Sequence, residues 1–265
     1  MTGQDAPPDP RAPRRGYKEF EFDLPGALLT ELFKTFSALH SEHLTADTAL
    51  TIPNEQGVYQ LFYQGQLVYI GKTDAESGLR QRLERHAFKV QHRRNLDPGQ
   101  VEFKAVRIFV FTAVDLEAGL LKHYERTRKV LWNGSGFGSN DPGRERDTTV
   151  VKEDNYDALY PIDIDRPLVI AFKSEQTAAQ AFNALKNAVP YTVRTQGAGG
   201  RSRQPHADLT TTNVTVLAAP SSTRNIVKQI TRQLPTGWQA TALPGYVILY
   251  KEARDYPHGV IVARS

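Results

Sequence analysis

The chain contains no cysteine among its 265 residues. That absence excludes disulfide bonds, zinc sites with thiolate ligands and catalysis by a cysteine nucleophile. No apolar run approaches the roughly 20 residues that a helix needs to cross a bilayer. The first residues also lack the apolar segment of a secretory signal peptide. The sequence therefore predicts a cytoplasmic protein with no membrane partner.

The formal net charge of +4 hides an asymmetry along the chain. Residues 166–265 hold 12 of the 33 basic residues and 4 of the 29 acidic residues, so this segment carries +8 and the remainder carries −4. A basic segment beside a mildly acidic one favours a polyanionic partner. Basic surfaces also serve solubility, so charge alone leaves both explanations open.

The length suits two domains rather than one. Residues 1–18 are rich in proline and predict a disordered tail. The stretch 141–166 is polar, and we place a boundary within it, between a domain over 19–165 and a basic domain over 166–265. In the first domain, apolar periodicity predicts a helix from residue 24, a hairpin over 57–71, a basic helix over 78–92, a strand over 101–111 and a helix over 115–131.

The second domain is expected to alternate strands and helices. Its βαβ-βαβ order predicts an α+β sandwich, for which the ferredoxin-like fold is the candidate. A loop rich in glycine and arginine over 197–203 interrupts this order. The expected elements are strands over 168–172, 191–195, 213–218, 246–250 and 260–264, and helices over 174–188 and 221–234.

Two tyrosines mark the hairpin of the first domain. Apolar and polar residues alternate over 58–63 and 67–70, with a short polar turn between them, which is typical of a β-hairpin. Tyr59 and Tyr69 lie on its neighbouring strands, where cross-strand neighbours approach each other. The sequence therefore predicts two phenols close together.

Residues suited to phosphodiester chemistry follow the hairpin in order. His86 lies four residues after Arg82, hence on the same helix face. Glu117 lies near the start of the next helix, and Asn133 precedes a glycine-rich loop over 134–138. Hydrolysis of a phosphodiester needs a deprotonated water, neutralisation of the developing charge and an electrophile near the leaving oxygen. This order of residues is what a metal-assisted phosphodiesterase needs.

The ordered series resembles the GIY-YIG nucleases over about residues 57–133. Gly57-Val58-Tyr59 corresponds to the first signature, with Val58 in place of its middle isoleucine, and Tyr69-Ile70-Gly71 matches the second. The stretches 82–86 and 132–147 are similar to the type II restriction enzymes of this superfamily, which cut the palindrome CCGCGG. The resemblance implies a small three-stranded antiparallel sheet flanked by helices. It does not extend beyond about residue 166.

The resemblance implies roles for the residues around the hairpin. Tyr59 is the candidate general base or proton relay, which requires that Arg82 and Lys72 lower its pKa. Arg82 is expected to bind the scissile phosphate with two donors. His86 is expected to hydrogen-bond a tyrosine or a phosphate, and Tyr69 to orient the water or the phosphate.

The resemblance also implies a metal ion. A single Mg²⁺, with Mn²⁺ as a substitute, is expected at Glu117, and waters and phosphate oxygens would complete its shell. Asn133 is expected to fix the hydrogen bonds around the metal-bound water. Sixteen residues separate Glu117 from Asn133, about one helical turn more than the nearest relatives lead us to expect. Glu125 on the same helix is therefore a rival ligand, but Glu117 follows a strand as the family pattern requires and is favoured.

Each of these residues has an ordinary explanation when taken singly. Strand tyrosines usually lie at the edge of a core, a lone helix histidine is commonly half-buried, and a run of arginines is commonly a solvated face. These explanations do not account for the order of the series. Candidate DNA contacts outside it are Arg144, Arg146, Arg201 and Arg203, since arginine suits guanine in the major groove but equally contacts phosphates.

We therefore expect a Mg²⁺-dependent, site-specific double-strand DNA endonuclease of a restriction-modification system, acting at a palindromic, GC-rich site. A palindromic target implies a two-fold assembly, either a homodimer or a homotetramer. The domain over 166–265 would add DNA contact or an oligomer interface. Two alternatives stay open: a nicking or structure-specific nuclease of repair or mobile elements, and a DNA-binding protein that does not cut.

Overall fold

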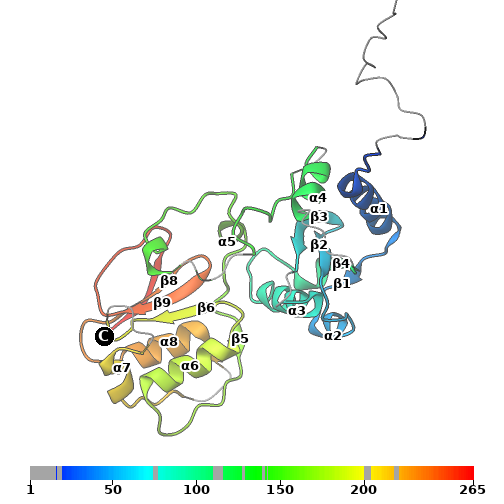
Figure 1. The fold of residues 1–265 in the computed structure, drawn as a ribbon. Coiled ribbons are helices and arrows are strands. Elements are labelled where there is room, and N and C mark those ends of the chain that lie inside the picture. Colours follow the sequence, from blue (N-terminus) through cyan, green and yellow to red (C-terminus); the bar gives the residue numbers. More distant parts are fainter. Residues whose placement is uncertain are drawn as a thin grey trace, which may run out of the picture.

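The computed structural model describes residues 16, 20–73, 77–109, 116–126, 129–138, 141, 143–199, 204–217 and 221–265. These residues form a mixed α+β structure, as the sequence predicts, and Figure 1 shows them in two lobes. The proline-rich segment 1–18 lies almost wholly outside the described residues. Among the described residues, no helix combines the length and the apolar character that crossing a membrane would require.

The sheet of the N-terminal lobe is built on the predicted hairpin. Strand β2 (Gly57–Tyr63) pairs with β3 (Gln66–Lys72) on one side and with β4 (Val101–Arg107) on the other, and both pairings are antiparallel. The two residues between β2 and β3, Gln64 and Gly65, have φ values of 52° and 73°, as a tight hairpin turn requires. A two-residue strand β1 (Glu42–His43) joins the outer edge of β4, so the sheet order is β1-β4-β2-β3.

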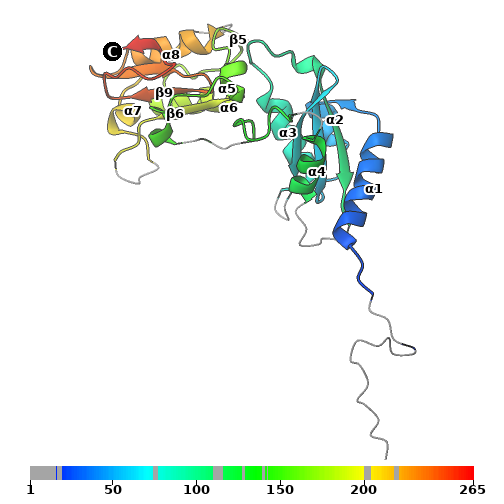
Figure 2. The same ribbon diagram turned by 90° about the horizontal axis from the view of Figure 1, so that it is seen from above.

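Helices cover both faces of this sheet. On one face, Leu79 and Leu83 of α3 (Leu79–Lys89) and Ala49 of α2 (Ala46–Leu50) share a core with Tyr59 and Leu61. On the other face, α1 (Leu24–Ala38) and α4 (Leu116–Tyr124) bury their apolar side chains against Val58 and Ile70. Figures 1 and 2 show α1 on the side turned away from the C-terminal lobe.

Three elements of this lobe are shorter than predicted. Helix α3 ends at Lys89 rather than 92, and His92 and Asn95 then adopt φ values of 51° and 63°, which stop a right-handed helix. Helix α4 ends at Tyr124 rather than 131. By residue 132 the chain lies along β3, where the Trp132 N–H donates to the Val68 carbonyl over 2.7 Å. Strand β4 ends at Arg107 rather than 111, and residues 110–115 lie outside the described residues.

The C-terminal lobe contains a second sheet, of order β10-β8-β9-β6. Its strands are β6 (Thr192–Thr195), β8 (Gln239–Ala242), β9 (Tyr246–Tyr250) and β10 (Val260–Arg264). Strands β6 and β9 are parallel, and the other neighbours are antiparallel. Helices α6 (Ala178–Ala188) and α8 (Thr223–Thr231) share a core with alternate residues of β9, Val247 and Leu249. Helix α7 (Ala207–Thr211) lies beside α6.

The ferredoxin-like expectation for this lobe is wrong. Of the strand expected over 168–172, only Leu168 lies in a strand, β5 (Pro167–Leu168), which pairs with β7 (Ser221–Ser222) outside the main sheet. The segment 213–217 forms no strand; the side-chain amides of Gln233 and Gln229 accept hydrogen bonds from the N–H groups of Thr215 and Leu217. An apolar alternation marks an extended, half-buried segment, but it does not say that the segment enters a sheet.

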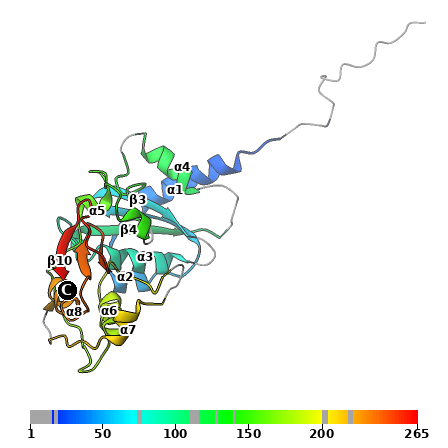
Figure 3. The same ribbon diagram turned by 90° about the vertical axis from the view of Figure 1, so that its left-hand side faces the viewer.

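Along the sequence, Tyr160 is the last residue that packs in the N-terminal core and Ile162 is the first in the C-terminal core, just before the expected boundary at 165. The chain crosses the division earlier, however. Tyr156, at the start of α5 (Tyr156–Leu159), packs in the N-terminal core, whereas Asp147, which precedes it in the chain, is buried against β9 of the C-terminal lobe. The chain therefore contacts the C-terminal lobe at Asp147, returns to the N-terminal core at Tyr156 and only then continues into the C-terminal lobe. Figure 1 shows α5 between the two lobes, and Figure 3 views them from the side of the C-terminal lobe.

Candidate active site

Two phenols meet on one face of the N-terminal sheet. In the β2–β3 pairing, Tyr59 lies opposite Gly71 and Leu61 opposite Tyr69, and the two tyrosine rings lie 6.0 Å apart between centroids. A Cβ atom on Gly71 would overlap the ring and hydroxyl of Tyr59. Gly71 therefore provides the space that the Tyr59 side chain fills.

His86 completes a compact aromatic cluster with the tyrosines. Its Nε2 lies 2.8 Å from the Tyr59 hydroxyl. The imidazole also stacks on Phe137 at 4.8 Å and meets the edge of Tyr69 at 5.3 Å. Helix α3 brings His86 here because Leu79, Leu83 and His86 recur at helical spacing on its buried face. The expected hydrogen bond from His86 to a tyrosine is present.

His86 is neutral over the physiological pH range. Burial lowers its pKa to about 3, and the nearby cations of Lys89, Arg85 and Arg82 act in the same direction. A neutral imidazole carries a hydrogen on one nitrogen only. Nδ1 is buried and has no hydrogen-bond partner among the described residues. The contact with Tyr59 is thus the one polar contact of this ring that the structure gives.

The pKa of Tyr59 is raised, contrary to the expected lowering by cations. Burial is the main cause, the neighbouring Tyr69 adds to it, and Arg82 opposes it without outweighing it. Burial also raises the pKa of Tyr69, followed by the Glu117 carboxylate. Tyr59 is 1% exposed. A free phenolate at Tyr59 is therefore unfavourable in the protein alone, and a relay suits this hydroxyl better than a general base does.

Arg82 and Glu117 lie at the same cluster. Each acts electrostatically on the pKa values of both Tyr59 and Tyr69. Arg82 lies one turn before His86 on α3, and Glu117 lies in the first turn of α4; both side chains are partly exposed. Helix α4 packs against β3, which brings the start of the helix to the tyrosines. Lys72 is exposed at the end of β3.

The rival ligand Glu125 lies elsewhere. It follows the end of α4 at Tyr124 and is exposed. Among the described residues, no three histidine, aspartate or glutamate side chains gather as a metal site. A lone carboxylate nevertheless suits Mg²⁺, which commonly takes one or two carboxylates and fills its octahedron with waters and substrate phosphates. The cluster therefore fits a magnesium site with Glu117 as the protein ligand.

Asn133 lies on the exposed edge of β3. Its Oδ1 accepts from the Ile70 N–H and its Nδ2 donates to the Ile70 carbonyl, both over 2.8 Å. Together with the Trp132 bond to Val68, these contacts satisfy backbone groups that an edge strand would leave unpaired. The Asn133 amide thus lies beside Ile70, the residue between Tyr69 and Gly71, and it holds in place the strand that carries Tyr69.

Two further residues of the cluster were not predicted. Phe137, in the glycine-rich loop, is buried between His86, Tyr69 and Trp132. Lys89 donates to the carbonyl of Phe137 and so holds this loop against α3, and burial lowers the pKa of Lys89 to about 8. The sequence carries a weak signal for both, since Lys89 follows His86 by three residues on one helix face and Phe137 is the large apolar residue among glycines.

Two of the four candidate DNA contacts, Arg144 and Arg146, lie among the described residues. Arg144 pairs with Glu252 over 2.7 Å and lies over the Tyr250 ring, so it is engaged with the C-terminal lobe. Arg146 is exposed at the end of a short 3₁₀ helix, η2 (Arg144–Arg146). Arg201 and Arg203 lie outside the described residues.

Comparison with other proteins leaves the family open. A scan of protein-family models gave no match to this chain, and a search of curated proteins gave none either.

Proposed function

We propose that the chain is a Mg²⁺-dependent, site-specific DNA endonuclease of the GIY-YIG type, and specifically a type II restriction enzyme. The observation that carries the proposal is the cluster at the β2–β3 hairpin. The Tyr59 hydroxyl lies 2.8 Å from His86 Nε2, and both lie within the electrostatic reach of Arg82. A merely structural tyrosine pair does not need a buried imidazole, an arginine and a carboxylate around it.

The proposed role of Tyr59 is a proton relay. The attacking water gives a proton to the Tyr59 oxygen while the phenolic proton passes along the hydrogen bond to His86 Nε2. The hydroxyl therefore never has to persist as a phenolate, which its raised pKa disfavours. Burial and the neighbouring cations also disfavour the protonated form of His86. The relay therefore requires the negative charge of the bound phosphate, which raises the pKa of His86 and allows Nε2 to take the proton.

The charged residues have complementary roles. Arg82 would bind the non-bridging oxygens of the scissile phosphate with two donors and stabilise the charge of the pentacovalent state. Glu117 would hold Mg²⁺, which when bound supplies Lewis-acid polarisation of the phosphate and of a water. Tyr69, more exposed than Tyr59, would hydrogen-bond the phosphate or the water. Asn133 would keep Tyr69 in place through its hold on β3.

A restriction enzyme with a palindromic site needs two active sites, one for each strand, and therefore a homodimer or homotetramer. The basic charge of residues 166–265, +8 in total, supports a role of this lobe in DNA affinity. Arg146, which is exposed on η2, is a candidate contact to bases or phosphates.

The test is a digest of unmethylated plasmid and phage DNA with Mg²⁺, followed by sequencing of the fragment ends. Discrete fragments that end at one palindrome are expected, and the palindrome CCGCGG is the first to inspect. Nicks or smears would instead indicate a repair or mobile-element nuclease. Salt-sensitive binding without any cleavage would reject the nuclease proposal in favour of a DNA-binding protein.

A pair of matched variants assigns the cleavage to this chain. Glu117→Gln removes the carboxylate at the tyrosines and is expected to lower the cleavage rate by at least ~10²-fold, as the loss of a key charge-stabilising group does. Glu125→Gln makes the same chemical change at an exposed position after α4 and is expected to cleave at the rate of the parent protein. Equal cleavage by the two variants would refute Glu117 as the metal ligand.

A further inference from the structure

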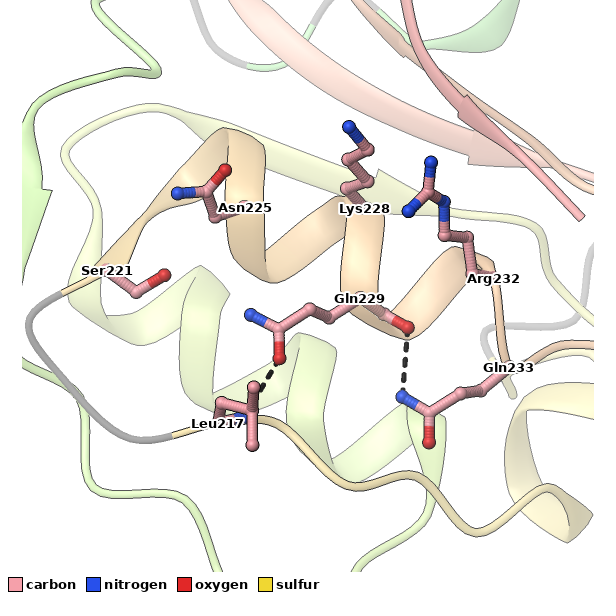
Figure 4. A pocket seen from close by; sticks show the side chains of 7 residues that line it. All are labelled: Leu217, Ser221, Asn225, Lys228, Gln229, Arg232 and Gln233. Atoms are coloured by element: carbon pink, nitrogen blue, oxygen red, sulfur yellow. Dashed lines mark hydrogen bonds between the residues drawn. The ribbon is translucent and has the colours of Figure 1, made fainter.

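A groove on the C-terminal lobe lies along α8, far along the chain from the tyrosine cluster. Its volume is about 440 Å³. Figure 4 shows its lining side chains on α8 and on the segment that runs beside the helix. The lining residues are Leu217, Ser221, Asn225, Lys228, Gln229, Arg232 and Gln233.

Among the described residues that line the groove, Lys228 and Arg232 are cationic and none carries a carboxylate. Asn225, Lys228 and Arg232 follow one another at spacings of three and four, so they share a face of the helix. Figure 4 shows these three side chains extending from the same side of α8. Neither Lys228 nor Arg232 forms an ion pair with a carboxylate of the described chain, whereas Arg194, Arg224 and Lys251 of the same lobe do. The positive charge of the groove is therefore available to an anion from outside.

The wall opposite α8 is held in place by side-chain amides. Gln229 accepts from the Leu217 N–H over 2.9 Å. Gln233 both accepts from the Thr215 N–H and donates to the Thr215 carbonyl, each over 2.9 Å. Because α8 itself buries Ile226, Val227 and Ile230 in the lobe core, both sides of the groove are fixed before any ligand arrives. A preformed site loses less entropy on binding.

We propose that the α8 groove binds the phosphodiester backbone of duplex DNA. From Asn225 to Arg232 the helix rises roughly 10 Å. Duplex DNA carries a charge every ~1.7 Å along its axis, so this distance spans several phosphates. Lysine and arginine neutralise phosphates, and amides such as Asn225 also donate to them. The polar lining, with two cations and no acid, fits a sugar-phosphate backbone better than a protein surface or a lipid.

The choice of DNA as the partner rests on the proposed function, but binding is measured apart from cleavage. The protein is the full chain with Glu117→Gln, and the probe is a short fluorescent duplex of random sequence, titrated at several salt concentrations. Lys228→Gln with Arg232→Gln removes both charges and keeps two good helix formers. The charge-matched control is Lys173→Gln with Lys186→Gln, at two exposed positions of the same lobe outside the groove.

The groove variant is expected to bind more weakly and to reduce the slope of log affinity against log salt by about two, one for each cation removed. Lys228→Arg is expected to keep the slope of the parent protein. An unchanged slope in the groove variant, or an equal reduction in the control, overturns the proposal even if the wild-type chain cleaves DNA. A reduced slope in a chain that never cleaves supports the groove and rejects only the nuclease. Weaker binding of the groove variant to duplex RNA but not to duplex DNA also overturns it.

Discussion

The side chain of Asn133 forms two hydrogen bonds with the backbone of one residue, Ile70, each 2.8 Å long. Ile70 stands between Tyr69 and Gly71 on the edge strand of the sheet. The asparagine amide therefore serves as a short stretch of neighbouring strand. It connects the segment before the glycine-rich loop to the strand that carries a catalytic candidate.

Replacing Asn133 should therefore affect stability as well as cleavage. Asn133→Ala leaves the N–H and the carbonyl of Ile70 without their partner, at roughly 1–3 kcal/mol for each unpaired buried group. Asn133→Asp should be worse, because it keeps an acceptor but directs a negative oxygen at the Ile70 carbonyl. Denaturant unfolding of both variants is the measurement. Full stability together with abolished cleavage would instead assign Asn133 to the metal-bound water.

Tyr59→Phe should separate a relay from a packing role. The ring stays and the hydroxyl beside His86 is removed, so cleavage is expected to fall by about 10²–10⁴-fold, the usual contribution of a proton-transfer group. Tyr63→Phe is the control, since that hydroxyl lies on the same strand but accepts only a 3.3 Å bond from the Asp97 N–H. Single-turnover cleavage of plasmid DNA measures both. Comparable rates for the two variants would reject the relay.

Gly71→Ala should disturb the site without changing any polar group. The added methyl would overlap the Tyr59 ring, which is buried and cannot move aside freely. We expect a loss of roughly 1–3 kcal/mol in unfolding free energy, together with reduced cleavage. In the control Gly99→Ala, the nearest atom to the new Cβ is the Asp97 carboxylate at 3.3 Å, so little change is expected. Thermal unfolding and the cleavage rate report both effects.

His86 should make the folded state less stable as the pH falls. Its folded pKa of about 3 lies below the ordinary value of 6.5, so below pH 6.5 the unfolded chain binds a proton that the folded chain does not. The unfolding free energy should then fall by about 1.4 kcal/mol per pH unit until the folded pKa is reached. His86→Leu should lack this component. Urea unfolding at several pH values tests it, and identical slopes in the two proteins would contradict the burial of a neutral imidazole.

The sequence predicts the N-terminal sheet well because its information there is local. Alternation and a Gln-Gly turn predict the hairpin. The register at the tyrosines is not predicted, because a β-bulge between Leu61 and Phe62 shifts the pairing by one residue and so brings Tyr59 opposite Gly71. The Arg82–His86 spacing likewise fixes one helix face. The ends of α3 and α4 could not be predicted, because tertiary contacts decide them: a backbone bond from Trp132 to Val68 commits the chain to the sheet edge by residue 132.

The sequence predicts much less about electrostatics and about the second lobe. Arg82 and Lys72 suggest a lowered pKa for Tyr59, but burial, which depends on Phe137 and the whole core, reverses the sign. Strand β8 was not predicted because Gln239-Ala240-Thr241-Ala242 has no strong apolar alternation, although all four residues are buried. The segment 213–217 alternates but is paired by glutamine side chains. In each case a long-range neighbour decides the outcome.

Asp141 and Asp147 pack on the C-terminal lobe, which limits where the chain can be divided to make a chimera with another protein. Asp147 accepts hydrogen bonds from Tyr246 and Tyr250 over 2.7 and 2.9 Å and pairs with Arg194 over 2.8 Å, yet Tyr156, later in the chain, belongs to the other core. A chimera joined at residue 165 would leave Arg194 largely buried without its carboxylates, and losing one partner of a buried pair costs roughly 3–5 kcal/mol. A chimera joined before 141 would instead remove Tyr156 from beside Trp132. Neither junction separates the two lobes cleanly. A chimera must therefore keep Asp147 with the C-terminal lobe and Tyr156 with the N-terminal core.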